Sequence, residues 1–228
     1  MSPPGGHPRR DAVPRPASAP GGWLARLFGR AARPPAEPLR WVVLDLETSG
    51  LDAANDRLIS IGAVAVHDRR IVVADSFEAT LRQPDASSRQ NILVHGIGAE
   101  TQLAGLEPAR ACEAFLAYAG QSPLVAFHAH FDRAFLARTA RTHLGASIGN
   151  AWIDLAELAP ALHPGTGARV LDEWLAHFGI PVEQRHHAVG DALATAMLFL
   201  VLLDEVPPAQ RRPRRLRRIA AQRRWLAG

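Results

Sequence analysis

The sequence contains no lysine, since all 26 of its basic residues are arginine. This absence excludes three groups of enzymes whose chemistry depends on a lysine: P-loop ATPases, protein kinases and enzymes that form a pyridoxal Schiff base. The single cysteine, Cys112, excludes a disulfide framework and any Cys-x-x-Cys motif for zinc or redox chemistry. We attribute the missing lysine to coding bias rather than to function.

Long apolar segments are also missing. The longest one, Ala192 to Leu203, has twelve residues and is interrupted by Thr195. A helix that crosses a bilayer needs about 20 apolar residues. We therefore expect this segment to form a buried core helix, and we expect a soluble, cytoplasmic protein without a membrane span.

The net charge of +4 over 228 residues conceals a strong segregation along the chain. Residues 1–40 carry a net charge of +5 and residues 207–228 a net charge of +8, whereas residues 41–206 carry −9. The pattern indicates an acidic folded body between two basic arms. An acidic body favours solubility, and it also suits a carboxylate site for divalent metal.

Composition divides the chain into three parts. Residues 1–39 are rich in proline and arginine and predict a disordered arm. Residues 40–206 form the expected folded domain, and residues 207–228 read as an arginine-rich, disordered C-terminal tail. This tail either adds non-specific phosphate contacts or is simply solvated.

The folded part changes its hydrophobic period along the chain. Three closely connected apolar runs at the start predict an antiparallel meander, and helices then alternate with short strands. This order predicts an α/β fold with a mixed sheet and helices packed on it. The expected strands are 41–46, 58–66, 71–81, 123–127 and 151–155, and the expected helices are 108–119, 132–144, 171–178 and 190–206.

A pair of acids ends the first expected strand. Asp45 and Glu47 are separated by one residue, so their side chains point to the same face of a strand. Two neighbouring carboxylates repel each other, and a divalent cation with a preference for hard oxygen ligands, such as Mg²⁺ or Mn²⁺, would neutralise them. Alone, this pattern is weak evidence, because it more often belongs to two solvated turn acids.

Three further polar residues follow other strand ends or helix starts. Asp132 comes after an apolar strand and opens a helix, and His186 precedes Asp191 on a loop that enters the long core helix. Together with Asp45 and Glu47, these residues are a suitable set for two-metal phosphodiester hydrolysis. In that chemistry a histidine accepts the proton of the attacking water.

At this point the sequence resembles the DEDDh 3′–5′ exonucleases, and in particular the proofreading epsilon subunit of bacterial DNA polymerase III. The resemblance rests on Asp-Leu-Glu-Thr-Ser-Gly-Leu-Asp at 45–52, on Phe131-Asp132, and on His186 with Asp191. It implies a ribonuclease H-like fold, a mixed five-stranded sheet flanked by helices. It also implies two Mg²⁺ or Mn²⁺ ions held by Asp45, Glu47, Asp132 and Asp191, with His186 as the general base.

The same resemblance implies four substrate contacts at the terminal nucleotide. They are Thr48 and Leu51 after the first motif, His95 in the segment Val94-His95-Gly96-Ile97, and Phe131. The chain departs from the family at Phe127-His128, where the family usually has His-Asn. The resemblance therefore does not determine the hydrogen bonding and packing near Asp132. His187 and the additional His130 are expected to face away from the site.

Three functions are compatible with these features. The first is hydrolysis of the 3′ end of DNA, single-stranded or frayed, in proofreading, repair or end trimming, with a DNA polymerase subunit as a possible partner. The second is the same hydrolysis at the 3′ end of RNA. It stays open because no recognisable motif in the sequence shows how the site treats the 2′-hydroxyl group. The third is a catalytically silent module that binds nucleic acid or a polymerase, which four clustered acids argue against.

Overall fold

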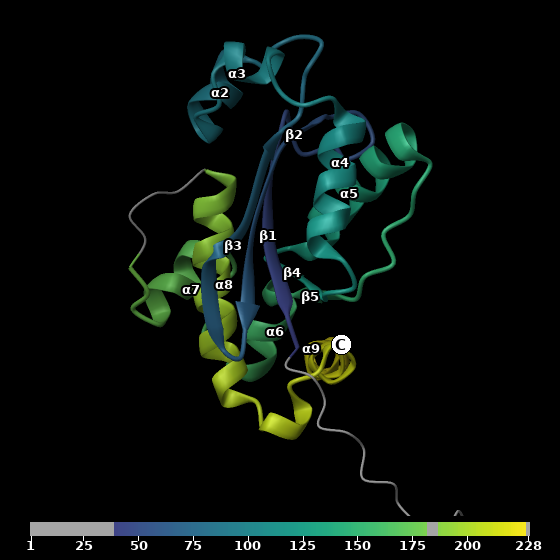
Figure 1. The fold of residues 1–228 in the computed structure, drawn as a ribbon. Coiled ribbons are helices and arrows are strands. Elements are labelled where there is room, and N and C mark those ends of the chain that lie inside the picture. The colour runs from purple at the N-terminus through teal and green to yellow at the C-terminus, as the bar shows by residue number, and fades with distance from the viewer. Residues whose placement is uncertain (1–38, 182–186, 227–228) are drawn as a thin grey trace, which may run out of the picture. The chain divides into compact units, whose positions relative to one another are not determined.

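The computed structural model describes residues 39–181 and 187–226, so the expected N-terminal arm lies outside the described residues. One mixed sheet carries helices on both faces (Figure 1). Its strands are β1 (Trp41–Thr48), β2 (Leu58–His67), β3 (Arg70–Thr80), β4 (Leu124–Ala126) and β5 (Trp152–Asp154). The helices are α2 (Arg89–His95), α3 (Ala99–Leu103), α4 (Pro108–Ala119), α5 (Ala129–Leu144), α6 (Leu155–Leu162), α7 (Leu171–His177), α8 (Ala188–Glu205) and α9 (Pro213–Leu226), with a 3-10 turn at Pro208–Gln210.

The sheet has the order β3-β2-β1-β4-β5. Strands β1 to β3 form the predicted antiparallel meander, and the β2–β3 hairpin turns at Asp68 and Arg69, which both have positive φ. Such a pair of residues matches the right-handed twist of the strands that a two-residue turn joins. Strands β4 and β5 are parallel to β1. The fold is therefore the ribonuclease H-like arrangement expected from the sequence.

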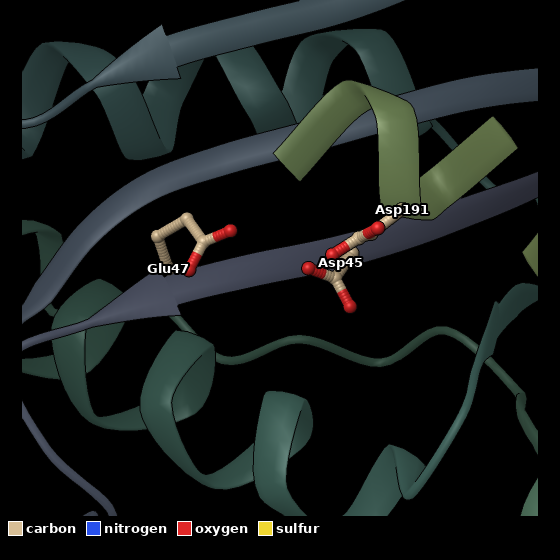
Figure 2. A group of neighbouring side chains, drawn as sticks. All are labelled: Asp45, Glu47 and Asp191. Atoms are coloured by element: carbon tan, nitrogen blue, oxygen red, sulfur yellow. The ribbon is translucent and has the colours of Figure 1, made fainter. Parts of the chain in front are cut away.

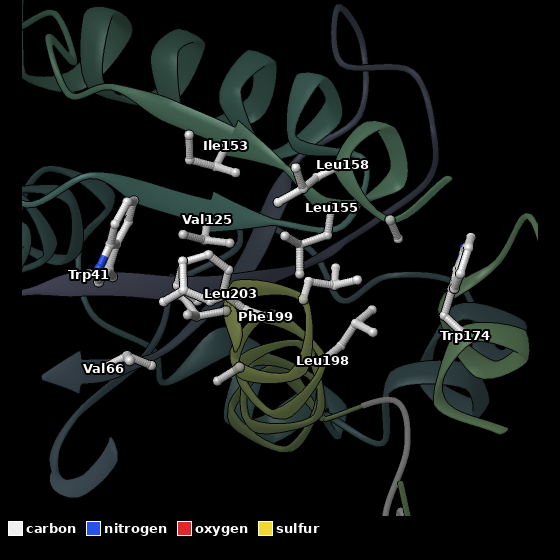
Figure 3. Packing of buried hydrophobic residues seen from close by; sticks show 14 of the residues in the cluster. Trp41, Val66, Val125, Ile153, Leu155, Leu158, Trp174, Leu198, Phe199 and Leu203 are labelled. Atoms are coloured by element: carbon white, nitrogen blue, oxygen red, sulfur yellow. The ribbon is translucent and has the colours of Figure 1, made fainter. Parts of the chain in front are cut away.

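Side chains of β1 alternate between two apolar cores. Val42 and Leu44 belong to the cluster on the α4 and α5 face, whereas Trp41 and Val43 belong to the cluster on the α8 face. Figure 3 shows this second cluster, in which Phe199 of α8 meets Trp41 edge-on with 5.1 Å between ring centroids. Because the alternation continues along the strand, the odd-numbered residues after Val43 also face α8.

The expectation of a disordered C-terminal arm was wrong for the described residues. Helix α9 packs on α6 and β5, and Leu216 and Ala220 are buried in the same core as α8. The physical reason is a narrow apolar stripe: Leu216, Ile219 and Ala220 are spaced three and four residues apart and so share one helix face. The surrounding arginines dominate the composition and mask this stripe in the sequence.

The long apolar helix is confirmed as a core element. Helix α8 packs across β1 and β2 and buries side chains on most of its circumference. Within the part of the chain that the structure describes, no helix combines the length and apolarity that a bilayer crossing requires.

A polar network joins the beginning of β1 to β3 and α4. The Arg40 guanidinium donates from Nε and Nη2 to the two carboxylate oxygens of Asp75, at 2.9 Å each, and from Nη1 to the Tyr118 carbonyl and Ser122 Oγ. It also lies over the Tyr118 ring, 4.6 Å from the centroid. The hydrogen bond from Arg40 is the main reason that the pKa of Asp75 lies below its usual range.

Replacing Asp75 by asparagine is expected to lower the free energy of unfolding by about 1–2 kcal/mol at pH 7, because a bidentate charged pair is lost. Since the pKa is lowered on folding, the stabilisation is present above the ordinary value of 3.8 and is lost as the pH falls through the folded-state value. Urea unfolding of both proteins at pH 7 and pH 3 measures this. A stability difference that is as large at pH 3 as at pH 7 would contradict the assignment.

Candidate active site

Three carboxylates meet on the α8 face of the sheet. Asp45 and Glu47 come from β1 and Asp191 from the first turn of α8, and each offers an oxygen atom within 4.8 Å of the others (Figure 2). Asp191 is buried, whereas Asp45 and Glu47 are half-buried. The structure thus brings together three of the four acids that the sequence singled out.

The meeting depends on a close approach of α8 to the sheet. Gly62 of β2 pairs with Asp45 of β1. A Cβ atom at Gly62 would clash with the backbone of Ala188 and Val189, the first two residues of α8. Only glycine leaves room for the helix to begin here. The start of α8, and with it Asp191, is therefore held directly over the strand pair that carries Asp45.

The chemistry of this donor set fits a divalent cation. All three groups are carboxylates, the hard oxygen ligands that Mg²⁺ and Mn²⁺ prefer. Carboxylates this close together repel one another when ionised. A bound cation attracts each of them and so offsets the repulsion. The residues can therefore hold a divalent metal ion.

Asp132 is buried in the first turn of α5 and is not a member of this group of three. The helix begins three residues earlier than the sequence indicated, so His128 and not Asp132 occupies the N-cap position. Burial raises the pKa of Asp132 well above its usual range, and the negative charge of Asp154 adds to the effect. A carboxyl group in this setting favours its protonated form unless a cation lies nearby.

Asp154 is a polar residue of this region that the sequence did not reveal. It ends β5, and its Oδ1 accepts hydrogen bonds from the backbone N–H groups of His128 and Ala156. The carboxylate thus links the start of α5 to the start of α6, while burial raises its pKa. Its only signal in the sequence was an acid near the end of the short expected strand 151–155.

The structure describes only one of the two neighbouring histidines that precede α8. His186, the expected general base, lies outside them. His187 is exposed at the N-cap of α8, and its Nε2 lies 3.2 Å from Glu78 Oε1 on β3. His130 is also exposed, 3.8 Å from Asp154.

Two of the expected substrate contacts flank the end of β1. Thr48 is buried and donates from Oγ1 to the Gly50 carbonyl, at 2.7 Å. Leu51 follows in the turn with 87% of its surface exposed. An isolated leucine so exposed beside an acidic site is accessible to a flat apolar partner such as a nucleobase.

The expected contact His95 is buried at the end of α2 and has partners for both ring nitrogens. Nδ1 accepts from the Ile97 N–H and Nε2 lies 2.9 Å from Asn91 Oδ1. Burial lowers its pKa, which favours the neutral ring. Asn91 also donates to the Thr48 carbonyl at 2.9 Å, which ties α2 to the end of β1. In this structure the histidine fixes the α2 loop beside the site.

Phe131 and the departure at Phe127-His128 lie next to Asp132. Phe131 packs against Phe135, with 4.7 Å between ring centroids. Phe127 packs against the core on the α8 face. His128 adopts the left-handed conformation with φ of 62°, a backbone that asparagine and histidine tolerate better than most residues. The pair Phe127-His128 therefore forms the turn that leads into α5.

Curated relatives include large polymerases. The DNA polymerase III of PolC type from Caldanaerobacter subterraneus is 33% identical over 175 residues, which are 73% of this chain and 12% of the polymerase. A DNA polymerase III subunit epsilon-like protein from Rhodobacter capsulatus is 31% identical over 175 residues, 75% of this chain and 25% of that protein. The chain thus spans a quarter or less of these relatives.

Solved structures share the fold. Exonuclease X in complex with 5′-overhanging duplex DNA aligns with a TM-score of 0.61 and 24% identity, over 80% of this chain and 99% of the other. The zinc-bound complex of Escherichia coli exonuclease I with single-stranded DNA gives 0.63 and 17%, over 75% and 42%. The model of the exonuclease family, RNase T type, matches residues 42–199. That is well over half of the sequence, and the chain belongs to the exonuclease family.

Proposed function

We propose that this chain hydrolyses phosphodiester bonds at the 3′ end of DNA, at single-stranded or frayed ends, with two divalent ions and a histidine base. The observation that carries the proposal is the cluster of Asp45, Glu47 and Asp191 on one face of the sheet in a member of the exonuclease family. This cluster also argues against a silent binding module, because packed carboxylates destabilise a site that has no cation to hold.

The residues divide the work of hydrolysis among them. Asp45, Glu47 and Asp191 hold the cations, and Asp132 completes the set from the first turn of α5. When bound, Mg²⁺ or Mn²⁺ supplies Lewis-acid charge at the attacking water and at the departing 3′ oxygen. His186 removes a proton from the water, a task for which the ordinary imidazole pKa near 6.5 is well matched at neutral pH.

The terminal nucleotide is positioned at the end of β1. Leu51 packs beside its base, Phe131 lies at the side of Asp132, and Thr48 provides the polar contact of the turn. His95 acts through the loop that it fixes, since both of its ring nitrogens have protein partners. Contacts of this kind raise the rate of hydrolysis only when they hold the reacting atoms in the right geometry.

DNA is the proposed substrate because the aligned relatives are named as DNA polymerase III proteins. A role in proofreading, repair or end trimming follows, and a polymerase subunit is the proposed partner.

Release of nucleotides from 3′-labelled single-stranded DNA and from RNA of the same sequence tests the proposal. With Mn²⁺ or Mg²⁺ we expect nucleoside 5′-monophosphates to be released from DNA, and no release in excess chelator. Faster release from RNA would move the assignment to an exoribonuclease. Binding of both polymers without any release, by pure folded protein, would select the silent module.

A further inference from the structure

A cavity of about 520 Å³ lies between α9, the first turn of α5 and the end of β5. It is separate from the group of three carboxylates, none of which lines it. Four guanidinium groups line its wall, from Arg133 on α5 and from Arg214, Arg217 and Arg218 on α9. Two acids, Asp154 and Glu157, also line it. The cavity therefore has an excess of positive charge.

The helix that carries three of these arginines is anchored and is not a loose tail. Leu216 and Ala220 hold α9 in the core, and Arg214, Arg217 and Arg218 share another face of the helix at spacings of three and four residues. Residues with this spacing have Cβ atoms about 5–6 Å apart. Cations on an anchored helix bind an anion with a smaller loss of backbone freedom than cations on a flexible arm.

Within the described part of the chain, no hydrogen bond or ion pair of the side chains of Arg214, Arg217 and Arg218 is found, and all three residues are exposed. Guanidinium groups that are aligned, solvated and unpaired form strong bidentate contacts with phosphate oxygens. The cavity thus offers donors for an anion.

The position of the cavity connects it to the carboxylate site. Ala129, His130 and Arg133 of its wall belong to the same helical turn as Asp132, and Asp154 on its rim influences the pKa of Asp132 by its charge. The rest of the domain is acidic, with a net charge of −9 over residues 41–206. A polyanion that reaches Asp132 therefore meets a concentration of positive charge in this cavity.

We propose that this cavity binds backbone phosphates of the nucleic-acid strand whose 3′ end is hydrolysed. The choice of ligand rests on the proposed function, while the site itself rests on the geometry of α9. It lengthens the contact with the strand beyond the terminal nucleotide, so that short substrates do not use it.

The test compares two double variants with the same change in charge. Arg214→Gln with Arg217→Gln removes two cavity arginines, and Arg212→Gln with Arg215→Gln removes two exposed arginines of the same segment that do not line the cavity. Binding of a 5′-fluorescein-labelled oligothymidylate of about twelve residues is measured by anisotropy in excess EDTA, between about 50 and 200 mM salt.

We expect the cavity variant to bind the oligonucleotide roughly tenfold more weakly at the lowest salt concentration, with a slope of log K against log salt smaller by about two. The control variant should change the affinity less than twofold. Hydrolysis of the p-nitrophenyl ester of thymidine 5′-phosphate with Mn²⁺, a substrate too short to reach the cavity, should be unchanged in both.

Equal losses in the two variants would overturn the proposal, because the effect would then be general charge. Weaker binding of poly-glutamate with unchanged binding of the oligonucleotide would assign the cavity to an acidic protein segment instead. Displacement of the oligonucleotide by thymidine 5′-monophosphate from the wild-type protein, but not from the cavity variant, would assign it to the released nucleotide. If no protein hydrolyses the ester, the proposed function fails, whereas the binding comparison still decides the cavity.

Discussion

Asp45→Asn is expected to reduce nucleotide release by at least about a thousandfold, which corresponds to roughly 4 kcal/mol of transition-state stabilisation. Asp45 is the member of the cluster that shares a strand with Glu47 and faces Asp191. Its loss removes a metal ligand and a charge together. A single-turnover assay with excess enzyme measures the effect on the chemical step.

The same substitution is expected to stabilise the protein when metal is absent. Removing one of three neighbouring carboxylates relieves repulsion on the order of 1 kcal/mol, so the Tm in EDTA should rise. Added Mn²⁺ should raise the Tm of the wild-type protein by mass action and leave the variant nearly unchanged. The exposed acid Asp85, replaced by asparagine, provides the control. Full activity of Asp45→Asn would mean that the measured nuclease is a contaminant.

Gly62→Ala is expected to lower activity about a hundredfold although residue 62 carries no functional group. Its Cβ would clash with the backbone of Ala188 and Val189, so α8 must move away from the sheet at its first turn. Displacing a catalytic group by about 1 Å costs on the order of a hundredfold in rate. Asp191 lies one turn into α8 and would move away from Asp45. Activity and Mn²⁺-induced thermal stabilisation should both fall.

Gly149→Ala is the matched control, because a Cβ at Gly149 meets no atom within 4 Å. Circular dichroism and size-exclusion chromatography establish that the Gly62 variant folds. A folded Gly62→Ala protein with wild-type metal binding and wild-type rates would show that the approach of α8 to β2 does not position the acids. If the variant does not fold at 37 °C, the metal titration is repeated at lower temperature, where the folded fraction reports on the site.

The sequence predicted the meander and the shared face of Asp45 and Glu47 because both follow from short-range periodicity. Apolar alternation in β1 identifies the strand, and the same alternation puts Asp45 and Glu47 on one face. Helix α4 was predicted at its observed bounds, since Pro108 marks its start and Gly120 its end. These features require no knowledge of what lies across the sheet.

Other features depend on contacts that periodicity does not encode. Helix α6 was not predicted, because it has eight residues and contains Pro160, which reads as a helix breaker. Helices α2 and α3 were not predicted either, because each is shorter than two helical turns. Asp154 is recognisable only once β5 has been placed beside β4, and Gly62 only once α8 has been laid over β2. The order of the sheet is what gives these residues their roles.

The anchoring of α9 has a practical consequence for work with shorter versions of this protein. A version that stops at residue 206, where the sequence suggested that the domain ends, would leave α6 and β5 without the helix that covers them. The newly exposed apolar surface favours self-association, which a binding assay would register as a loss of affinity unrelated to charge. Expression boundaries and fusion partners are therefore best placed beyond Leu226, and the contribution of the arginines is best measured by side-chain replacement within the intact helix.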